Sequence, residues 1–273
     1  MKYDLTYLSL GAGVQSSALL LMSNKGLFNV PKADIAIFSD TQSEPPWVYE
    51  HLEKLHELSK IPIATTTAGN LGKDTTERKI VKGTGKRAWV TIPVFQPNDD
   101  GASVPTIRTC TRIYKIEPIR KFVREYLKYE PRQRIKSKVL ALLGISRDEA
   151  SRMKASPLHW VDHGYPLVDA RLTRLDCLNL LNEYGWPTPK KSACYFCPYM
   201  ADSNWNDMKT NYQEIWSQAV EFDRAIRNLG GGEKKMFLHK SSKPLEDVDF
   251  THGGQMQFET NGFNNECEGM CGV

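Results

Sequence analysis

A glycine-containing loop near the N-terminus is the first candidate for binding chemistry. Gly11 and Gly13 follow a short apolar stretch and come just before a helical pattern that starts at Ser16. Two residues without side chains let the backbone approach a phosphate group, and the start of a helix supplies free N–H donors. A tight turn without a ligand fits the same pattern, and the loop lacks the Gly-Lys-Ser/Thr ending of a P-loop. The residues expected at this site are Ser9, Gly11, Ala12, Gly13, Gln15, Ser16 and Ser17.

An acid and a hydroxyl group, Asp40 and Thr41, follow the second apolar stretch of the chain. Ligands of open parallel sheets bind where the carboxyl ends of the strands meet. Asp40 and Thr41 could therefore hold a ribose, an adenine edge or a metal ion. The alternative is a helix cap, because Pro45 and Pro46 come next and proline is typical of the first helical turn.

Cysteines form the third group of candidates. Cys194 and Cys197 form a C-x-x-C turn, which lets two thiolates reach one metal but supplies only half of a tetrahedral site. Cys177 lies among leucines and is expected to be a core thiol. The pattern leaves a [4Fe–4S] cluster, a zinc ion and a redox or plain dithiol as alternatives. The predicted metal ligands are Cys110, Cys194, Cys197 and Cys267, and Cys271 is a further tail thiol.

Alternating strands and helices are needed to position these groups. Apolar and β-branched runs predict strands at residues 3–8, 34–38, 61–66 and 139–144, and a short extended piece at 165–168. Helical periodicity predicts helices from residue 16, and at 47–58, 116–127, 174–184 and 204–229. The alternation predicts an α/β fold with a doubly wound, mostly parallel sheet.

Two domains are expected, with a boundary near residue 190. Residues 1–190 would form the nucleotide-binding unit, and residues 191–273 a helical extension that carries the C-x-x-C turn and a cysteine-containing tail. Residues 70–103 are rich in Gly, Lys, Thr and Asp, and only residues 89–95 have an ordered pattern. This segment is predicted to be a mobile insertion near the site.

Composition excludes several protein classes. The 273 residues are 40% hydrophobic and 25% charged, as in ordinary globular proteins. No apolar run reaches the roughly 20 residues that span a bilayer, and the first ten residues lack the layout of a signal peptide. We therefore expect a cytoplasmic protein. The net charge of +4 is compatible with an anionic substrate and too small to establish nucleic-acid binding.

Four segments, in order, resemble the PP-loop ATP pyrophosphatases, also called adenine nucleotide alpha-hydrolase-like proteins. The most similar branch contains the phosphoadenylylsulfate (PAPS) reductases and the sulfur-transfer proteins of DNA phosphorothioation. Residues 12–16 resemble its S-x-G-x-Q-S loop, and residues 40–46 its D-T-G-x-x-x-P-E-T motif. Residues 110–118 resemble C-x-x-x-K-x-x-P, and residues 144–152 resemble G-x-R-x-x-E-S-x-R. The resemblance extends over about residues 5–200.

The resemblance implies a bound adenine nucleotide, either ATP with Mg²⁺ or a sulfonucleotide. The glycine-containing loop, Asp40 and Thr41 would line its site. Arg147 and Arg152 would neutralise phosphate or sulfate oxygens, a role suited to guanidinium groups, and Lys115 could do the same. A solvated helix face is the alternative for the two arginines. The implied catalytic residues are Lys115, Arg147, Cys267 and Cys271.

The C-terminal tail resembles only the beginning of the Glu-Cys-Gly-x-His ending of PAPS reductases. Glu266 and Cys267 match, but Glu268 replaces the glycine, no histidine follows, and Cys271 is added. The two flanking acids would raise the pKa of the Cys267 thiol, which disfavours a nucleophile. Metal ligation and sulfur shuttling fit the two tail cysteines equally well.

Three functions follow from these expectations. The first is ATP-dependent adenylation and sulfur transfer to an acceptor such as a nucleic acid, with a sulfur donor protein such as a cysteine desulfurase as partner. The basic segment 73–87 could bind a polyanion, and a solvated loop is its alternative. The second is a PAPS or adenylylsulfate reductase that releases sulfite. The third is a non-catalytic, nucleotide-sensing module of a modification or defence system.

Overall fold

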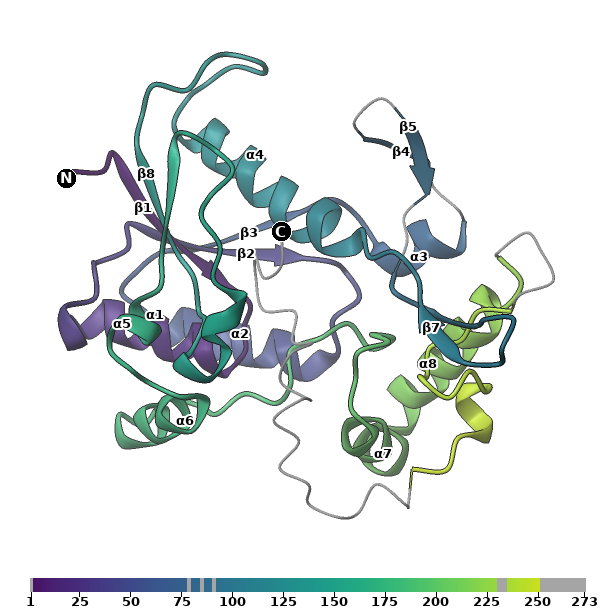
Figure 1. Ribbon diagram of the computed structural model, residues 1–273. Coiled ribbons are helices and arrows are strands. Elements are labelled where there is room, and N and C mark those ends of the chain that lie inside the picture. The colour runs from purple at the N-terminus through teal and green to yellow at the C-terminus, as the bar shows by residue number, and fades with distance from the viewer. Residues whose placement is uncertain (1, 78–79, 84–85, 90–91, 230–234, 251–273) are drawn as a thin grey trace.

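A parallel five-stranded sheet forms the centre of the computed structural model, which describes residues 2–77, 80–83, 86–89, 92–229 and 235–250 (Figure 1). Its strand order is β3-β2-β1-β8-β9, and all neighbouring pairs are parallel. The strands are β1 (Leu5–Leu10), β2 (Ile35–Asp40), β3 (Ile63–Thr67), β8 (Val139–Leu142) and β9 (Val161–Gly164). The predicted α/β class is confirmed by this sheet.

Alternate side chains of each strand enter two different cores. On β1, Leu8 and Leu10 face one core while Leu5 and Tyr7 face the other. The first core is covered by α1 (Val14–Lys25), α2 (Pro46–Leu58), α5 (Pro166–Asp169) and α6 (Arg174–Glu183). The second is covered by α4 (Glu117–Tyr126) and the preceding turn η2 (Arg112–Ile116). The sheet is therefore wound on both faces, as the sequence predicts.

A third core lies beyond the carboxyl ends of the strands. It contains α3 (Leu71–Thr76), α7 (Asp202–Asn211) and α8 (Gln213–Ile226) together with the C-x-x-C segment. A hairpin of β6 (Phe95–Pro97) and β7 (Ser103–Pro105) joins it through a bridge between Phe95 and Phe237. This core thus combines residues from the predicted insertion with residues from the predicted C-terminal extension.

The remaining elements are short. β4 (Ile80–Gly83) and β5 (Lys86–Trp89) form an antiparallel hairpin that projects from the body (Figure 1). Three short helical turns complete the described chain: η1 (Leu27–Asn29), η3 (Arg147–Arg152) and η4 (Leu245–Asp247). No helix in the described ranges is long and apolar enough to cross a bilayer.

Three expectations for local structure were wrong. The extended piece predicted at residues 165–168 is the start of α5, and the strand is β9, whose Asp162, His163 and Gly164 break the apolar pattern. The helix predicted over 204–229 is two helices, because Tyr212 leaves the helical conformation (φ −137°, ψ 62°) and packs its ring against Trp47. The segment 70–103 contains α3, β6 and a hairpin in its described part, where the sequence predicts order only near 89–95.

Candidate functional site

The loop of residues 9–17, here called the glycine loop, joins the carboxyl end of β1 to the start of α1. Ala12 has a positive φ of 55°, which is uncommon for a residue with a side chain. The Ser16 hydroxyl accepts hydrogen bonds from the backbone N–H groups of Gly11 and Gly13, each at 3.2 Å. Ser16 therefore shapes the loop from within.

The end of β8 packs directly against the first turn of α1. A Cβ atom built on Gly144 would lie 3.0 Å from the backbone nitrogen of Ser16 and 3.1 Å from its Cα. Only glycine fits such an approach without a backbone shift. The sequence predicts residues 144–152 and the glycine loop to share a site, and the structure places these two segments in contact.

Two buried hydroxyl groups, one at the start of the loop and one after β8, have no hydrogen-bond partner among the described residues. They are Ser9 Oγ, on β1, and Ser146 Oγ, just after β8, and both residues are at most 3% exposed. Buried polar atoms are almost always hydrogen-bonded, so these two hydroxyl groups at the carboxyl ends of β1 and β8 are open to a polar partner such as water or a ligand. Ser146 lies inside one of the motifs noted above, but its hydroxyl was not predicted as a site group.

Two other predicted loop residues, Gln15 and Ser17, face the protein. Gln15 is fully buried and its side-chain amide is bonded to Glu149 and Arg174. Ser17 is bonded to His51 in the core, with 2.9 Å between Oγ and Nε2, and burial lowers the pKa of His51 to about 4. Gln15 and Ser17 therefore support the loop instead of lining its open side.

The two predicted arginines occupy different environments. Arg152 is half-buried and forms an ion pair with the buried Glu149. Arg147 is exposed at the start of η3. Arg174, which the sequence did not indicate, is the guanidinium group that contacts the glycine loop.

The side chains of Asp40 and Thr41, at the end of β2, have different hydrogen-bond partners. One oxygen of Asp40 accepts from the Gln42 backbone at 2.7 Å and from the Tyr49 hydroxyl at 2.9 Å. Thr41 is fully buried, and its hydroxyl lies 3.3 Å from both Glu44 Oε1 and Cys194 Sγ. Thr41 thus belongs to a second site, which the cysteines line.

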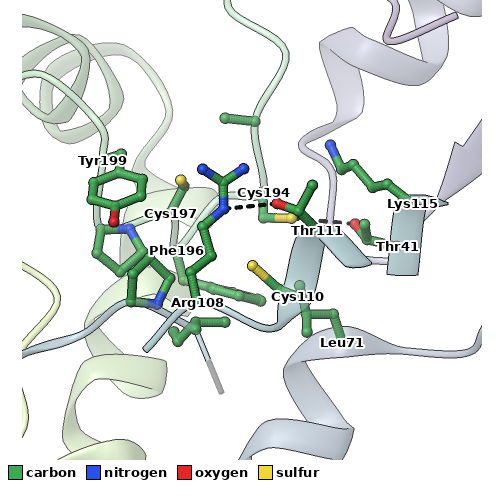
Figure 2. Close-up of a pocket in the computed structure, with 14 residues that line it drawn as sticks. Thr41, Leu71, Arg108, Cys110, Thr111, Lys115, Cys194, Phe196, Cys197 and Tyr199 are labelled. Atoms are coloured by element: carbon green, nitrogen blue, oxygen red, sulfur yellow. Dashed lines mark hydrogen bonds between the residues drawn. The ribbon is translucent and has the colours of Figure 1, made fainter. Parts of the chain in front are cut away.

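Three predicted metal ligands line one cavity, here called the thiol pocket. Cys110, Cys194 and Cys197 come from two distant segments and surround a space of about 30 Å³, which is room for an ion or a few atoms. Figure 2 shows their sulfur atoms around the side chain of Arg108, whose Nε donates to Thr111 at 2.7 Å. Arg108 also lies over the ring of Tyr199, 5.6 Å from its centroid.

One lining residue of this pocket, Lys115, belongs to a buried ion pair. Lys115 Nζ lies 3.5 Å from Glu44 Oε1, and the Glu44 side chain is only 1% exposed. The second carboxylate oxygen of Glu44 is buried without a partner. Burial, together with the charge of Glu44, raises the pKa of the Cys194 thiol well above its usual value, against smaller opposing effects of Lys115 and Thr41. In the absence of a metal, this environment favours the neutral form of the Cys194 thiol.

A metal centre is not assembled by the described residues. Within these ranges no group of three cysteine, histidine or acidic side chains is placed to hold a metal ion. The predicted fourth ligand, Cys267, and its neighbour Cys271 lie outside the described residues. The shared pocket of Cys110, Cys194 and Cys197 agrees with the predicted grouping, and the metal itself stays a prediction. Cys177 is fully buried among leucines, as expected of a core thiol.

The loop and the pocket are physically connected. The Ser192 hydroxyl donates to the carbonyl of Gly11, and the next two residues, Ala193 and Cys194, line the thiol pocket.

Glu44 is the main residue near this pocket that the sequence did not predict. Its place directly before two prolines made it indistinguishable from an acid at a helix start.

Comparison with known proteins finds similarity to solved structures and no match to a protein-family model or a curated protein. A solved structure of phosphoadenylyl-sulfate (PAPS) reductase from Candida auris, in a phosphate complex, is similar at 15% sequence identity and a TM-score of 0.42. The match covers 69% of this chain and 76% of that chain. PAPS reductases are the group that the motifs resemble, and the α/β assignment itself stands on the parallel sheet described above.

Proposed function

We propose that this chain is an enzyme that binds an adenine nucleotide at the glycine loop and uses it to activate an acceptor for sulfur transfer. The observation that carries the proposal is the pair of buried, unpartnered hydroxyls of Ser9, at the start of the loop, and Ser146, just after β8. Phosphate oxygens are strong acceptors and would satisfy both hydroxyl groups. The position at the carboxyl end of a parallel sheet is where nucleotides bind in such folds.

The proposed reaction has two steps. In the first, an acceptor oxygen attacks the α-phosphorus of ATP, so that an oxygen–phosphorus bond forms and pyrophosphate leaves. In the second, a sulfur nucleophile attacks the atom that carries the adenylated oxygen, and AMP leaves with that oxygen. The thiol pocket supports a sulfur step at the same site, because its lining residues Ala193 and Cys194 directly follow Ser192, which is bonded to Gly11 of the loop.

We further propose that the acceptor has a polyanionic backbone. This acceptor class is supported by the basic residues of segment 73–87, since lysine and arginine bind phosphates in a salt-dependent way. A nucleic acid is the acceptor class that this charge would fit, and a cysteine desulfurase is the class of protein that would deliver the sulfur. Mg²⁺ would accompany ATP, and the iron–sulfur cluster or zinc ion predicted for the cysteines would need further ligands beyond Cys110, Cys194 and Cys197.

Nucleotide binding can be tested by calorimetry with ATP and Mg²⁺. We expect Ser146→Ala and Ser9→Ala each to weaken binding about tenfold, because each removes one hydrogen bond to a charged group. Ser217→Ala, on the exposed side of α8, is the matched control and should bind as the wild type does. Wild-type affinity in both loop variants would contradict the proposed site.

The reaction class can be separated by its products. Pyrophosphate released from ATP in the presence of an acceptor supports adenylation. Sulfite released from PAPS or adenylylsulfate without ATP would instead identify a reductase. Nucleotide binding without turnover across nucleic-acid acceptors would identify the non-catalytic alternative.

A further inference from the structure

Gln15 lies immediately behind the glycine loop, and both ends of its side-chain amide are engaged by the protein. Its Nε2 donates to Glu149 Oε2 at 3.2 Å, and its Oε1 accepts from Arg174 Nη1 at 2.7 Å. The residue is 0% exposed. A side chain held in this way braces the loop and is not directed at a ligand.

The orientation of this amide is fixed by the charges of its neighbours. A carboxylate accepts and a guanidinium donates, so the NH₂ group must face Glu149 and the oxygen must face Arg174. The reverse orientation would place two acceptors together and two donors together. One conformation of Gln15 therefore satisfies both contacts.

The contacts continue into two other segments. Glu149, 2% exposed, also forms an ion pair with Arg152 inside η3. The backbone N–H of Arg174, at the first residue of α6, donates to Asp148 Oδ1 at 3.2 Å. The start of α1, η3 and the start of α6 are thereby joined by charged hydrogen bonds around one amide.

We propose that Arg174 is a positioning residue that holds the glycine loop in its ligand-binding shape through Gln15. The inference rests on the proposed function, because the ligand is the phosphate chain of the adenine nucleotide. Arg174 acts on the loop and not on the adenosine part. Removing it releases the Gln15 amide and loosens the first turn of α1.

The experiment compares Arg174→Met, Gln15→Met, the double variant and wild type in the full chain. Binding of ATP and of adenosine is measured by calorimetry, and hydrogen exchange of the peptide covering the glycine loop is measured in the nucleotide-free protein. Arg171→Met is the control, because Arg171 is an exposed arginine three residues before Arg174. Thermal unfolding confirms that each variant is folded.

We expect each single variant to bind ATP about tenfold more weakly, and the double variant to bind no more weakly than either one. Adenosine affinity should stay unchanged, and exchange in the loop peptide should rise in Arg174→Met but not in Arg171→Met. Wild-type ATP affinity in Arg174→Met, or losses that multiply in the double variant, would overturn the proposal. If the wild type binds no adenine nucleotide, the proposed function fails and the exchange measurement decides on Arg174, with unchanged exchange overturning its role.

Discussion

The glycine loop and the thiol pocket lie next to each other but are built in different ways. The loop is one contiguous stretch between a strand and a helix, and Ser16 organises its backbone from inside. The pocket is assembled from Thr41, from the segment around Cys110 and Lys115, and from the C-x-x-C turn, and Glu44 contacts Thr41 and Lys115 of this lining. A contiguous motif carries its own geometry, whereas a pocket of this kind depends on the packing of a whole core.

The difference extends to electrostatics. Around the loop, charges are paired in a chain in which each donor faces an acceptor, with Gln15 between Glu149 and Arg174. In the pocket, Glu44 has one oxygen shared by Thr41 and Lys115 and one oxygen unpaired. We therefore expect substitutions in the pocket to cost more stability than substitutions at the loop.

The largest expected effect concerns the thiols. If the pocket holds a metal with the tail, Cys197→Ala should remove it and lower stability strongly, because metal binding is coupled to folding. The measurement is iron, zinc and labile-sulfide content with an absorbance spectrum of anaerobically purified protein. Cys177→Ala, a buried thiol away from the pocket, is the control and should keep the metal. A wild-type protein with neither iron nor zinc would rule out the metal prediction.

The buried ion pair gives the next largest effect. Lys115→Met leaves the Glu44 carboxylate buried opposite an apolar group, and we expect the free energy of unfolding to fall by about 3–5 kcal/mol. Chemical denaturation measures it. The double variant Lys115→Met with Glu44→Gln should recover most of the loss, since no charge is then left uncompensated. An unchanged stability in Lys115→Met would show that the pair is not a coupled unit.

The pH dependence of stability tests the support beneath the loop. His51 has a folded-state pKa of about 4, below its unfolded value, because burial against Ser17 disfavours the charged ring. Its contribution is complete above about pH 6.5 and is lost as the pH falls from 6.5 toward 4, by roughly 2–3 kcal/mol. Denaturation curves over this range measure the effect, and His51→Gln should have a flatter profile. The same slope in both proteins would exclude His51 as its source.

The close approach at Gly144 gives the smallest stability effect and the most local one. Gly144→Ala forces a Cβ against the backbone of Ser16, and we expect a loss of about 1–3 kcal/mol together with weaker nucleotide binding. Gly164→Ala is the control, because its nearest neighbour at 3.2 Å is the side chain of Leu142, which can move. Equal losses of nucleotide affinity in the two variants would show that the loop does not depend on this contact.

Much of the fold was predictable because its elements are local. The apolar runs of β1, β2, β3 and β8 and the helical periods of α2 and α4 follow from patterns within a few residues. Strand β9 was not predicted because polar residues break its apolar pattern. The helix break at Tyr212 was not predicted because it depends on a tertiary contact, the packing of the Tyr212 ring against Trp47. Strand boundaries shifted by about two residues, since neighbouring strands and not propensity set where pairing stops.

The sequence alone determined the position of the glycine loop, the pairing of Cys194 and Cys197 in one turn and the α/β class, because spacing and residue type suffice for each. Only the tertiary structure decided that Gln15 and Ser17 face inward, that Ser146 has an unpaired hydroxyl, that Arg174 contacts Gln15, and that Glu44 contacts Thr41 and Lys115. The physical reason is that burial and charge pairing arise between segments far apart in the sequence: Ser17 and His51 are 34 positions apart, Glu44 and Lys115 71, and Gln15 and Glu149 134.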